Sequence, residues 1–280
     1  MTGCKQRKGY LVIRIRQVLF SARHILGFKI HLEPNTNSDL IQNFLKTTRP
    51  VGSGLELIRI GGPGDGGYLL PNDLEGITAI YSPGVSDVSD FEFFFAEKDI
   101  ECYLLDYSVE SPALIHNKFN FSKRFLGHST FGHFVSLSDW LRENNETGGD
   151  LILQMDIEGY EWEILESIEV QTLRSFRIMV VEFHDMANRL FNKDKFEEVK
   201  KIFDLLLEEF HIVHVHLNNC CKTVNSRGVL LAPVWEVTFL RKDRVLDADY
   251  SYKLPHKLDR PNLPDESAIK IPKQWRKINL

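Results

Sequence analysis

Cysteine is scarce in this chain, and its spacing excludes the structures that cysteine usually builds. The four cysteines of the 280 residues form no C-x-x-C pair and no zinc-ligand spacing; they are Cys4, Cys102, Cys220 and Cys221. Neighbours such as Cys220 and Cys221 make poor disulfide partners because so short a bridge is strained. The sequence therefore predicts no structural disulfide, as expected of a cytoplasmic protein in a reducing compartment.

Long apolar runs are also missing, even from the basic segment that opens the chain. Before the first acid, Glu33, arginines interrupt every apolar stretch well short of the roughly 20 residues that a spanning helix needs. No small-residue cleavage site follows this segment. The mixture predicts a basic amphipathic N-terminal extension over residues 1–32. Two interpretations stay open: a helix that packs on the domain or on a partner subunit, and peripheral contact with a membrane.

Basic residues are in deficit over the rest of the chain. The formal net charge is −5 although the first 32 residues carry only basic charges, so the main body is distinctly acidic. Recognition of a nucleic-acid duplex normally needs a basic face over the binding domain. We therefore expect no nucleic-acid partner.

Strand-like and helix-like segments alternate after Glu33, which is typical of an α/β fold with a mostly parallel sheet and helices on both faces. An amphipathic helix is predicted around residues 196–210. The last two strands are joined through Gly228 without a helix, so we expect them to pair antiparallel. The strands are expected at 78–82, 100–106, 151–156, 177–184, 210–217 and 234–240.

The loop after the first of these strands contains one glycine, Gly84, and lacks the further glycines of the G-x-G-x-x-G motif that binds a dinucleotide. At the end of the next strand, Asp106 is placed to accept hydrogen bonds from the two hydroxyls of a ribose. A single-glycine loop combined with this acid suits S-adenosylmethionine, whose ribose needs the acid but which carries no phosphate. The alternative for Asp106 is a turn-forming aspartate at a strand end.

Clustered carboxylates follow the apolar strand 151–155 directly. Because ligands of open α/β sheets bind outside the carboxyl ends of the strands, Asp156 and Glu158 are predicted to reach a site. The alternative is an acidic loop that only caps the next helix. In that helix a stripe at helical spacing is expected to face the core: Trp162, Ile164, Leu165 and Ile168.

Three motifs follow one another along the chain: GGPGDGGYLL at 61–70, YSPGV at 81–85 with Phe91 and Glu92 downstream, and DIEGYEW at 156–162. In this order they resemble FkbM-type and methyltransferase-like proteins. The resemblance covers roughly residues 55–245 and implies a Rossmann-like class I methyltransferase fold: a mostly parallel seven-stranded sheet, an antiparallel terminal hairpin and S-adenosylmethionine as cofactor. It suggests a methyltransferase domain over 50–245 and a C-terminal tail over 246–280 packed on it. Segments 214–219 and 258–262 also look like parts of the methyltransferase-like branch. Pro83 departs from the pattern, since a small flexible residue is more usual there.

The glycine-rich segment 61–67 lacks the Gly-Lys-Ser/Thr ending of a phosphate-binding P-loop. It is either a turn between strands or a wall of the cofactor site. In the second case Asp65 and Gly66 of this segment bind the cofactor. The other expected cofactor-binding residues are Ser82, Pro83, Gly84, Val85, Asp106 and Tyr107.

A hydroxyl acceptor needs a base or a metal, because it is a weak nucleophile near neutral pH. Asp156, Glu158 and His184 are the predicted catalytic residues, with Asp156 the first candidate for the base. Glu161 and Glu182 are further candidates for base, acceptor contact or ligand of a divalent metal, and the spacing does not decide among these roles. His214 and His216 share one face of a strand, where packing is favoured over metal binding.

The sequence and the resemblance thus predict an S-adenosylmethionine-dependent methyltransferase that acts on a hydroxyl oxygen of a sugar, a glycan or a natural product. Two alternatives stay open: a nicotinamide-dependent oxidoreductase on a Rossmann sheet, which the missing glycines disfavour, and a non-catalytic binding module with the same fold.

Overall fold

A computed structural model describes residues 35–144, 150–226 and 228–276 of the chain. The predicted N-terminal extension, residues 1–32, lies outside the described residues. None of the described helices has the length and apolar character needed to cross a membrane.

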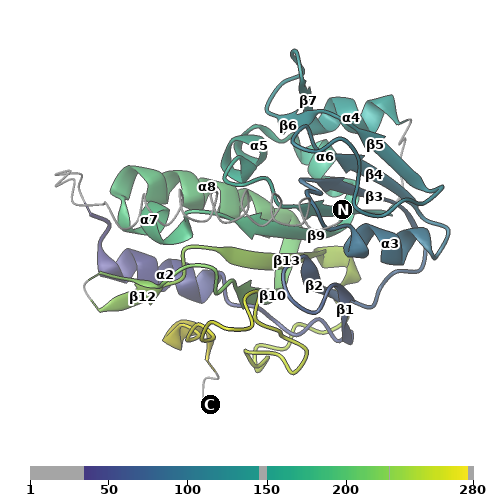
Figure 1. Ribbon diagram of the computed structural model, residues 1–280. Coiled ribbons are helices and arrows are strands. Elements are labelled where there is room, and N and C mark those ends of the chain that lie inside the picture. The colour runs from purple at the N-terminus through teal and green to yellow at the C-terminus, as the bar shows by residue number, and fades with distance from the viewer. Residues whose placement is uncertain (1–34, 145–149, 227, 277–280) are drawn as a thin grey trace.

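The described chain alternates strands and helices, as the sequence predicts (Figure 1). The helices are α2 (Ser38–Thr47), α3 (Asp90–Ala96), α4 (Leu137–Glu143), α5 (Glu161–Ser167), α6 (Val170–Arg174), α7 (Met186–Phe191) and α8 (Lys193–Glu209), with short 3-10 turns at Lys242–Arg244 and Lys273–Trp275. The strands are β1 (Leu57–Gly61), β2 (Gly67–Pro71), β3 (Ile77–Pro83), β4 (Glu101–Leu105), β5 (Phe119–Ser122), β6 (Phe125–Gly127), β7 (Phe134–Ser136), β8 (Asp150–Met155), β9 (Phe176–Phe183), β10 (Phe210–Leu217), β11 (Val224–Ser226), β12 (Val229–Leu231) and β13 (Trp235–Arg241).

The central sheet has seven strands in the order β10-β13-β9-β8-β3-β4-β5. Neighbours from β5 to β9 pair in parallel, whereas β13 pairs antiparallel with both β9 and β10. The six predicted strands and the antiparallel pairing of the last two are confirmed. This mixed, mostly parallel sheet is the class I methyltransferase arrangement. The apolar side chains of β8 and β9 explain the central position of these strands, since both are buried along almost their whole length.

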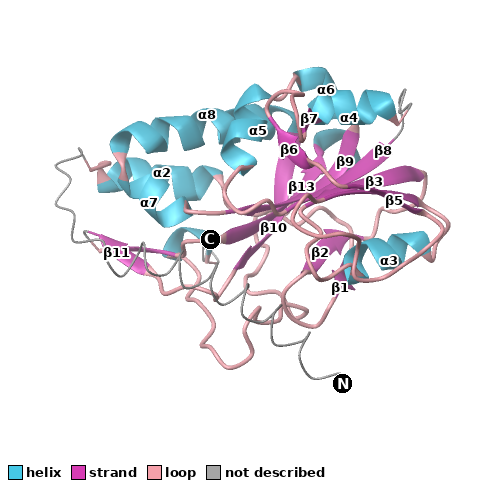
Figure 2. Ribbon diagram, turned by 45° about the horizontal axis from the view of Figure 1, so that its top comes forward, coloured by secondary structure: helices cyan, strands magenta, loops and turns pink. Residues whose placement is uncertain are grey.

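The two faces of the sheet are covered differently (Figure 2). One face packs against α2, α4, α5, α7 and α8 in the larger apolar core, which includes Phe203 of the predicted amphipathic helix and the predicted core residues of α5. The other face packs against α3 and the β1–β2 hairpin in a smaller core. Asn192 caps α8, because its side-chain oxygen accepts from the backbone N–H groups of Asp194 and Lys195.

The glycine-rich segment is the turn of the antiparallel β1–β2 hairpin, in which Gly61 pairs with Gly67. Glycine is required at Gly61, where φ is +92° and a Cβ would lie 2.1 Å from the Gly66 carbonyl oxygen. Arg59 holds the turn by donating from Nε to the carbonyl of Gly62 and from Nη2 to that of Gly64. The segment is therefore a turn, and its position decides whether it also contributes to a site.

The C-terminal segment returns to the body of the domain and lies below β10 in Figure 1. Trp275 is buried, its ring centroid lies 4.8 Å from that of Trp235, and its Nε1 donates to the Leu45 carbonyl at 2.6 Å. Asn262 of the same segment is buried at the carboxyl edge of the sheet. The tail thus brings a polar side chain from late in the sequence to that edge.

Candidate functional site

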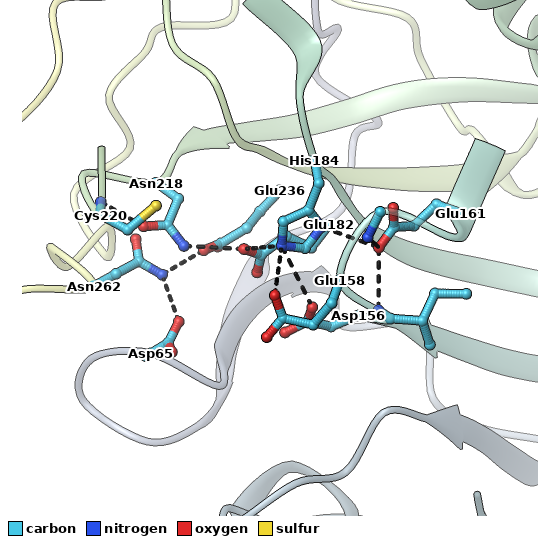
Figure 3. A network of polar contacts seen from close by, with 12 residues as sticks. Asp65, Asp156, Glu158, Glu161, Glu182, His184, Asn218, Cys220, Glu236 and Asn262 are labelled. Carbon is cyan, nitrogen blue, oxygen red and sulfur yellow. Dashed lines mark hydrogen bonds and ion pairs between the residues drawn. The ribbon is translucent and has the colours of Figure 1, made fainter. Parts of the chain in front are cut away.

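The acidic loop after β8 is organised by Glu161, the first residue of α5. Its Oε1 accepts from the backbone N–H groups of Ile157 at 3.1 Å and Gly159 at 3.2 Å, and its side chain is fully buried. Glu158 and Gly159 have φ of 59° and 104°, so the loop reverses sharply. No side chain of the described residues caps the start of α5, so Glu161 fixes the loop itself and does not cap the helix. Asp156 and Glu158 point toward His184 (Figure 3).

His184 follows β9 and faces this loop. Its Nδ1 lies 3.0 Å from Glu161 Oε1, while its Nε2 lies 3.9 Å from both Asp156 Oδ1 and Glu158 Oε2. The backbone carbonyl of His184 accepts from Trp162 Nε1 at 2.9 Å, which fixes the turn after the strand. The structure thus brings together the three predicted catalytic residues.

A second group of carboxylates lies on the other side of His184 (Figure 3). Glu182 Oε1 lies 3.7 Å from His184 Nε2, and Glu182 pairs directly opposite Glu236 in the antiparallel β9–β13 ladder. Asn218 Nδ2 donates to Glu182 at 3.1 Å. Asn262 Nδ2 bridges two acids, because it lies 2.5 Å from Glu236 Oε1 and 3.0 Å from Asp65 Oδ1. Asp65, from the hairpin turn, therefore joins the acidic side of the site and not the loops expected to hold the cofactor.

These groups perturb one another's protonation. Burial raises the pKa of Asp156 well above its ordinary value; the His184 imidazole opposes this rise, and the Glu158 carboxylate adds to it. Burial likewise raises the pKa of Glu182, with a further rise from Asp156 and Glu236. Burial raises the pKa of Glu236 to about 7. Burial thus favours the protonated forms of Asp156, Glu182 and Glu236.

His184 has the opposite balance. Burial by itself would lower its pKa, but the Glu161 carboxylate, helped by Asp156 and Glu158, raises the pKa to about 10. The imidazole is consequently a cation and a hydrogen-bond donor at neutral pH. It neutralises part of the acidic cluster.

Asp106 lies at the carboxyl end of β4, as predicted, with only 7% of its surface exposed. Its Oδ2 accepts from the Ser86 backbone N–H at 2.9 Å and its Oδ1 from that of Ser108 at 2.7 Å. It ties the loop after β3 to the loop after β4, and each oxygen keeps a further lone pair for a hydroxyl. Tyr107 packs beside it against His133, at 4.4 Å between ring centroids.

Gly84 is required by the packing of the loop against the neighbouring backbone. Its φ is +93°, and a Cβ would lie 1.7 Å from the carbonyl oxygen of Asp156. The loop after β3 and the end of β8 thus meet backbone to backbone, with Gly84 N–H donating to the Leu105 carbonyl at 2.8 Å. Pro83 and Val85 are buried, and Gly66, in the hairpin turn, faces Val88.

We call the contact between the Gly84 backbone and the Asp156 carbonyl the Gly84 seam. Ser82 is fully buried beneath it, so its side chain belongs to the interior of the domain. Its hydroxyl contacts a carboxylate oxygen of Glu92 and lies 2.6 Å from Gln154 Oε1. One hydroxyl has one proton, so Ser82 donates to Gln154 and a protonated Glu92 donates to Ser82. This agrees with the pKa of Glu92, which burial raises to about 7. Gln154 in turn contacts Tyr68, at 3.3 Å between Nε2 and the phenol oxygen.

His214 and His216 contact the C-terminal segment. His214 Nε2 lies 2.9 Å from Asp259 Oδ1, and His216 Nε2 lies 3.0 Å from Asn262 Oδ1. The segments 214–219 and 258–262, paired in the sequence resemblance, therefore meet in space. In the described part of the chain neither histidine belongs to a group with metal-ligand geometry.

Among the described residues, two groups of side chains place ligand-type atoms within 4.8 Å of one another: Asp156 with Glu161 and His184, and Asp65 with Glu182 and Glu236. In the first group Glu161 Oε1 is already engaged by two backbone N–H groups and by His184, so its role is to position the loop and the imidazole. The second group consists only of carboxylates.

Sequence reasoning missed Glu236, Asn218 and Asn262. A signal for Glu236 existed, since a lone acid in the apolar strand Trp235–Arg241 needs a partner if it is buried. Asn218 and Asn262 lie in segments singled out by the resemblance, but only the fold shows that their amides reach Glu182 and Glu236.

Comparison with known families gives a match to the model of the methyltransferase FkbM domain over residues 83–217. A search of curated proteins found no match for the chain. The matched segment begins at the end of β3 and ends with β10, so it includes Gly84, Asp106, Asp156, Glu182 and His184. The chain therefore carries a methyltransferase domain of the FkbM family, an enzyme domain whose implied methyl donor is S-adenosylmethionine.

Proposed function

We propose that this methyltransferase acts on a hydroxyl oxygen of a neutral, polyhydroxylated acceptor, such as a sugar, a glycan or a related natural product. The observation that carries the proposal is the composition of the acidic side of the site. Carboxylates and amides from the hairpin turn, β8, β9, β13 and the C-terminal segment converge there (Figure 3). Carboxylates accept hydrogen bonds from hydroxyls, and amides both accept and donate them. The negative charge of the carboxylates would repel a phosphorylated or carboxylated acceptor.

The charge of the cluster supports this choice of acceptor. Among the side chains labelled in Figure 3, all from the described residues, His184 is the one that carries positive charge. Arg59, the nearby arginine, is occupied by the carbonyls of Gly62 and Gly64. An anionic group would therefore find no arginine or lysine of this set to pair with.

Asp156 is the proposed base. Its pKa is raised by burial, which makes its carboxylate a better proton acceptor near neutral pH than an ordinary aspartate. The side chain is 29% exposed, so a bound acceptor can reach it. When S-adenosylmethionine is bound, its sulfonium would supply the methyl group to the acceptor oxygen, and Asp156 would accept the proton of the acceptor hydroxyl.

His184 acts beside Asp156 as a fixed cation. Because Glu161 holds its Nδ1, the Nε2–H is directed toward Asp156, Glu158 and Glu182. The positive charge of the imidazolium reduces the repulsion among the carboxylates of Asp156, Glu158 and Glu182. Asp156 can therefore stay near the acceptor. Glu158, whose side chain is 64% exposed, lies at the rim and is placed to contact an acceptor hydroxyl.

The residues after β3 and β4 fit the methyl donor. S-adenosylmethionine supplies an electrophilic methyl group on a sulfonium sulfur. Asp106 has the chemistry to bind a ribose hydroxyl pair, because its two oxygens are fixed by backbone N–H groups and retain lone pairs. Tyr107 and the turn at 83–86 are placed to line the same side, and the Gly84 seam holds this side directly against Asp156.

Methylation assays on matched acceptors test the proposal. The full chain is incubated with S-adenosylmethionine and with pairs of neutral and phosphorylated sugars, neutral glycans and small phenols, and mass spectrometry records the gain of one methyl group. We expect the gain on neutral hydroxyl compounds and its absence from the phosphorylated partners.

A control variant, Glu163→Gln, removes one negative charge at an exposed position of α5 and should retain full turnover. Methyl transfer confined to the phosphorylated acceptors would overturn the proposed acceptor. S-adenosylmethionine binding without any transfer across the panel would favour the binding-module alternative.

A further inference from the structure

Asp65, Glu182 and Glu236 come from three distant parts of the sequence, and their ligand-type oxygens all lie within 4.8 Å of one another. Glu182 and Glu236 are cross-strand neighbours at the junction of the parallel and antiparallel parts of the sheet, and both are about 95% buried. Asp65 approaches them from the exposed hairpin turn. Like charges directly opposite in a ladder destabilise it unless something compensates them.

The compensation within the protein is incomplete. Asn218 donates to Glu182 Oε1, and the Asn262 amide serves both Asp65 and Glu236. Within the described residues, however, Glu182 Oε2 is buried and has no hydrogen-bond partner. A buried carboxylate oxygen without a partner is costly, and native proteins rarely leave one without a proton, water or ion.

We propose that Asp65, Glu182 and Glu236 bind one divalent cation that prefers oxygen ligands, Ca²⁺ or Mn²⁺. The donors are carboxylates only, with no thiolate or imidazole among the three, which favours hard cations over Zn²⁺. Two oxygens that each lie about 2.4 Å from one ion are at most about 4.8 Å apart, so the three acids reach a Ca²⁺-sized ion with little movement. Mg²⁺, with bonds of about 2.1 Å, requires the acids to close further.

The neighbouring group of Asp156, Glu161 and His184 is the alternative location for the ion. Its Glu161 Oε1 is occupied by the backbone N–H groups of Ile157 and Gly159 and by His184 Nδ1, so these contacts would have to be rearranged. In the all-carboxylate group Glu182 Oε2 has no hydrogen-bond partner among the described residues.

Three protein oxygens leave part of a shell of about six to eight ligands open on the side of Asp65. If the acceptor is the polyhydroxylated compound proposed above, its hydroxyls can fill these positions; this step alone rests on the proposed function. Cation binding itself requires neither methyl donor nor acceptor.

The test is therefore a titration of the full chain with Mn²⁺ alone, in the absence of methyl donor and acceptor, with free Mn²⁺ measured by electron paramagnetic resonance and with Ca²⁺ as competitor. We expect one bound equivalent that Ca²⁺ displaces. Glu182→Gln and Glu236→Gln should each weaken binding at least tenfold, whereas Glu163→Gln should leave it unchanged.

Asp65→Asn keeps the test decisive if the buried variants fail to fold, because Asp65 is exposed; it should weaken binding severalfold with an unchanged circular dichroism spectrum. Absence of Mn²⁺ binding to the wild-type chain, or binding that none of the three variants affects, would overturn the proposal. A loss in Asp156→Asn as large as that in Glu182→Gln would place the ion in the other group and would also overturn it.

Discussion

The two sides of the carboxyl edge are built on different principles. On the proposed cofactor side, the loops after β3 and β4, Asp106 is fixed by two backbone N–H groups and Gly84 is packed against backbone. On the acidic side, burial raises the pKa values of Asp156 and Glu182, and one buried oxygen of Glu182 lacks a partner among the described residues. The first side keeps its shape by its own hydrogen bonds. The second retains electrostatic repulsion that a proton, a substrate or a cation can relieve.

Gly84→Ala should break the contact between the two sides, with the largest effect. The new Cβ would lie 1.7 Å from a backbone oxygen of Asp156, and φ is already +93°. Because no flexible side chain can yield, we expect a loss of about 4 kcal/mol or more in the free energy of unfolding, or failure to fold. Urea denaturation measures it. Gly132→Ala is the control: its Cβ would lie in open space, so it should lower the free energy of unfolding far less. Equal losses in the two variants would contradict the close backbone contact at Gly84.

Glu92→Gln should sharpen the comparison, since Glu92 is a perturbed acid beneath the cofactor side. Its folded-state pKa of about 7 exceeds the ordinary value of 4.5. The folded state therefore keeps its proton between these values while the unfolded state loses it, so stability falls as pH rises through this window. The amide of the variant can donate to Ser82 at every pH.

Urea denaturation at several pH values measures this contribution. The stability of the variant minus that of the wild type should increase from pH 4 to pH 8 by up to about 3 kcal/mol, at about 1.4 kcal/mol per pKa unit. A difference that does not change with pH would show that Glu92 is ionised in the folded protein.

Asp156→Asn tests the acidic side as the place of chemistry. Removal of the base should lower kcat by about 100-fold or more, while the affinity for S-adenosylmethionine, bound on the other side, changes less than threefold. Single-turnover methylation and isothermal titration calorimetry measure the two quantities. A variant with full turnover would exclude Asp156 as the base.

Asp106→Asn should give the smallest effect and the reverse pattern. An amide keeps the shape of the carboxylate but binds a ribose hydroxyl pair less well, so we expect about tenfold weaker binding of S-adenosylmethionine and little change in kcat at saturation. Calorimetry on the folded variant provides the measurement. Unchanged affinity would remove Asp106 from the cofactor site.

The sequence predicted the side of Asp106 better than it predicted the acidic side. The strands around Asp106 and Asp156 were predictable because apolar runs and the acids that end them are local in the sequence. The partners of the acidic side were not, because Asp65 and Asn262 are 197 residues apart and meet only through the fold. The function of Glu161 was also hidden: its spacing from Asp156 indicates a helix start, but not that its carboxylate binds Ile157, Gly159 and His184.

The hairpin turn at 61–67 was singled out in the sequence, but its neighbours could not be read from it. Gly61 and Gly67 are explained by the close backbone packing of the turn itself. The informative residue is Asp65, whose contact with Asn262 assigns the turn to the acidic side.

The reversed direction of β13 has a consequence for how such a site can diversify. A parallel strand reaches the carboxyl edge with its final residues, but β13 reaches that edge with its first ones, so Glu236 directly follows the excursion through β11 and β12. Insertions or substitutions in residues 218–234 can therefore alter the surroundings of Glu236 while the register of the central strands stays unchanged. A change in the length or sequence of this loop thus also changes the surroundings of a site residue.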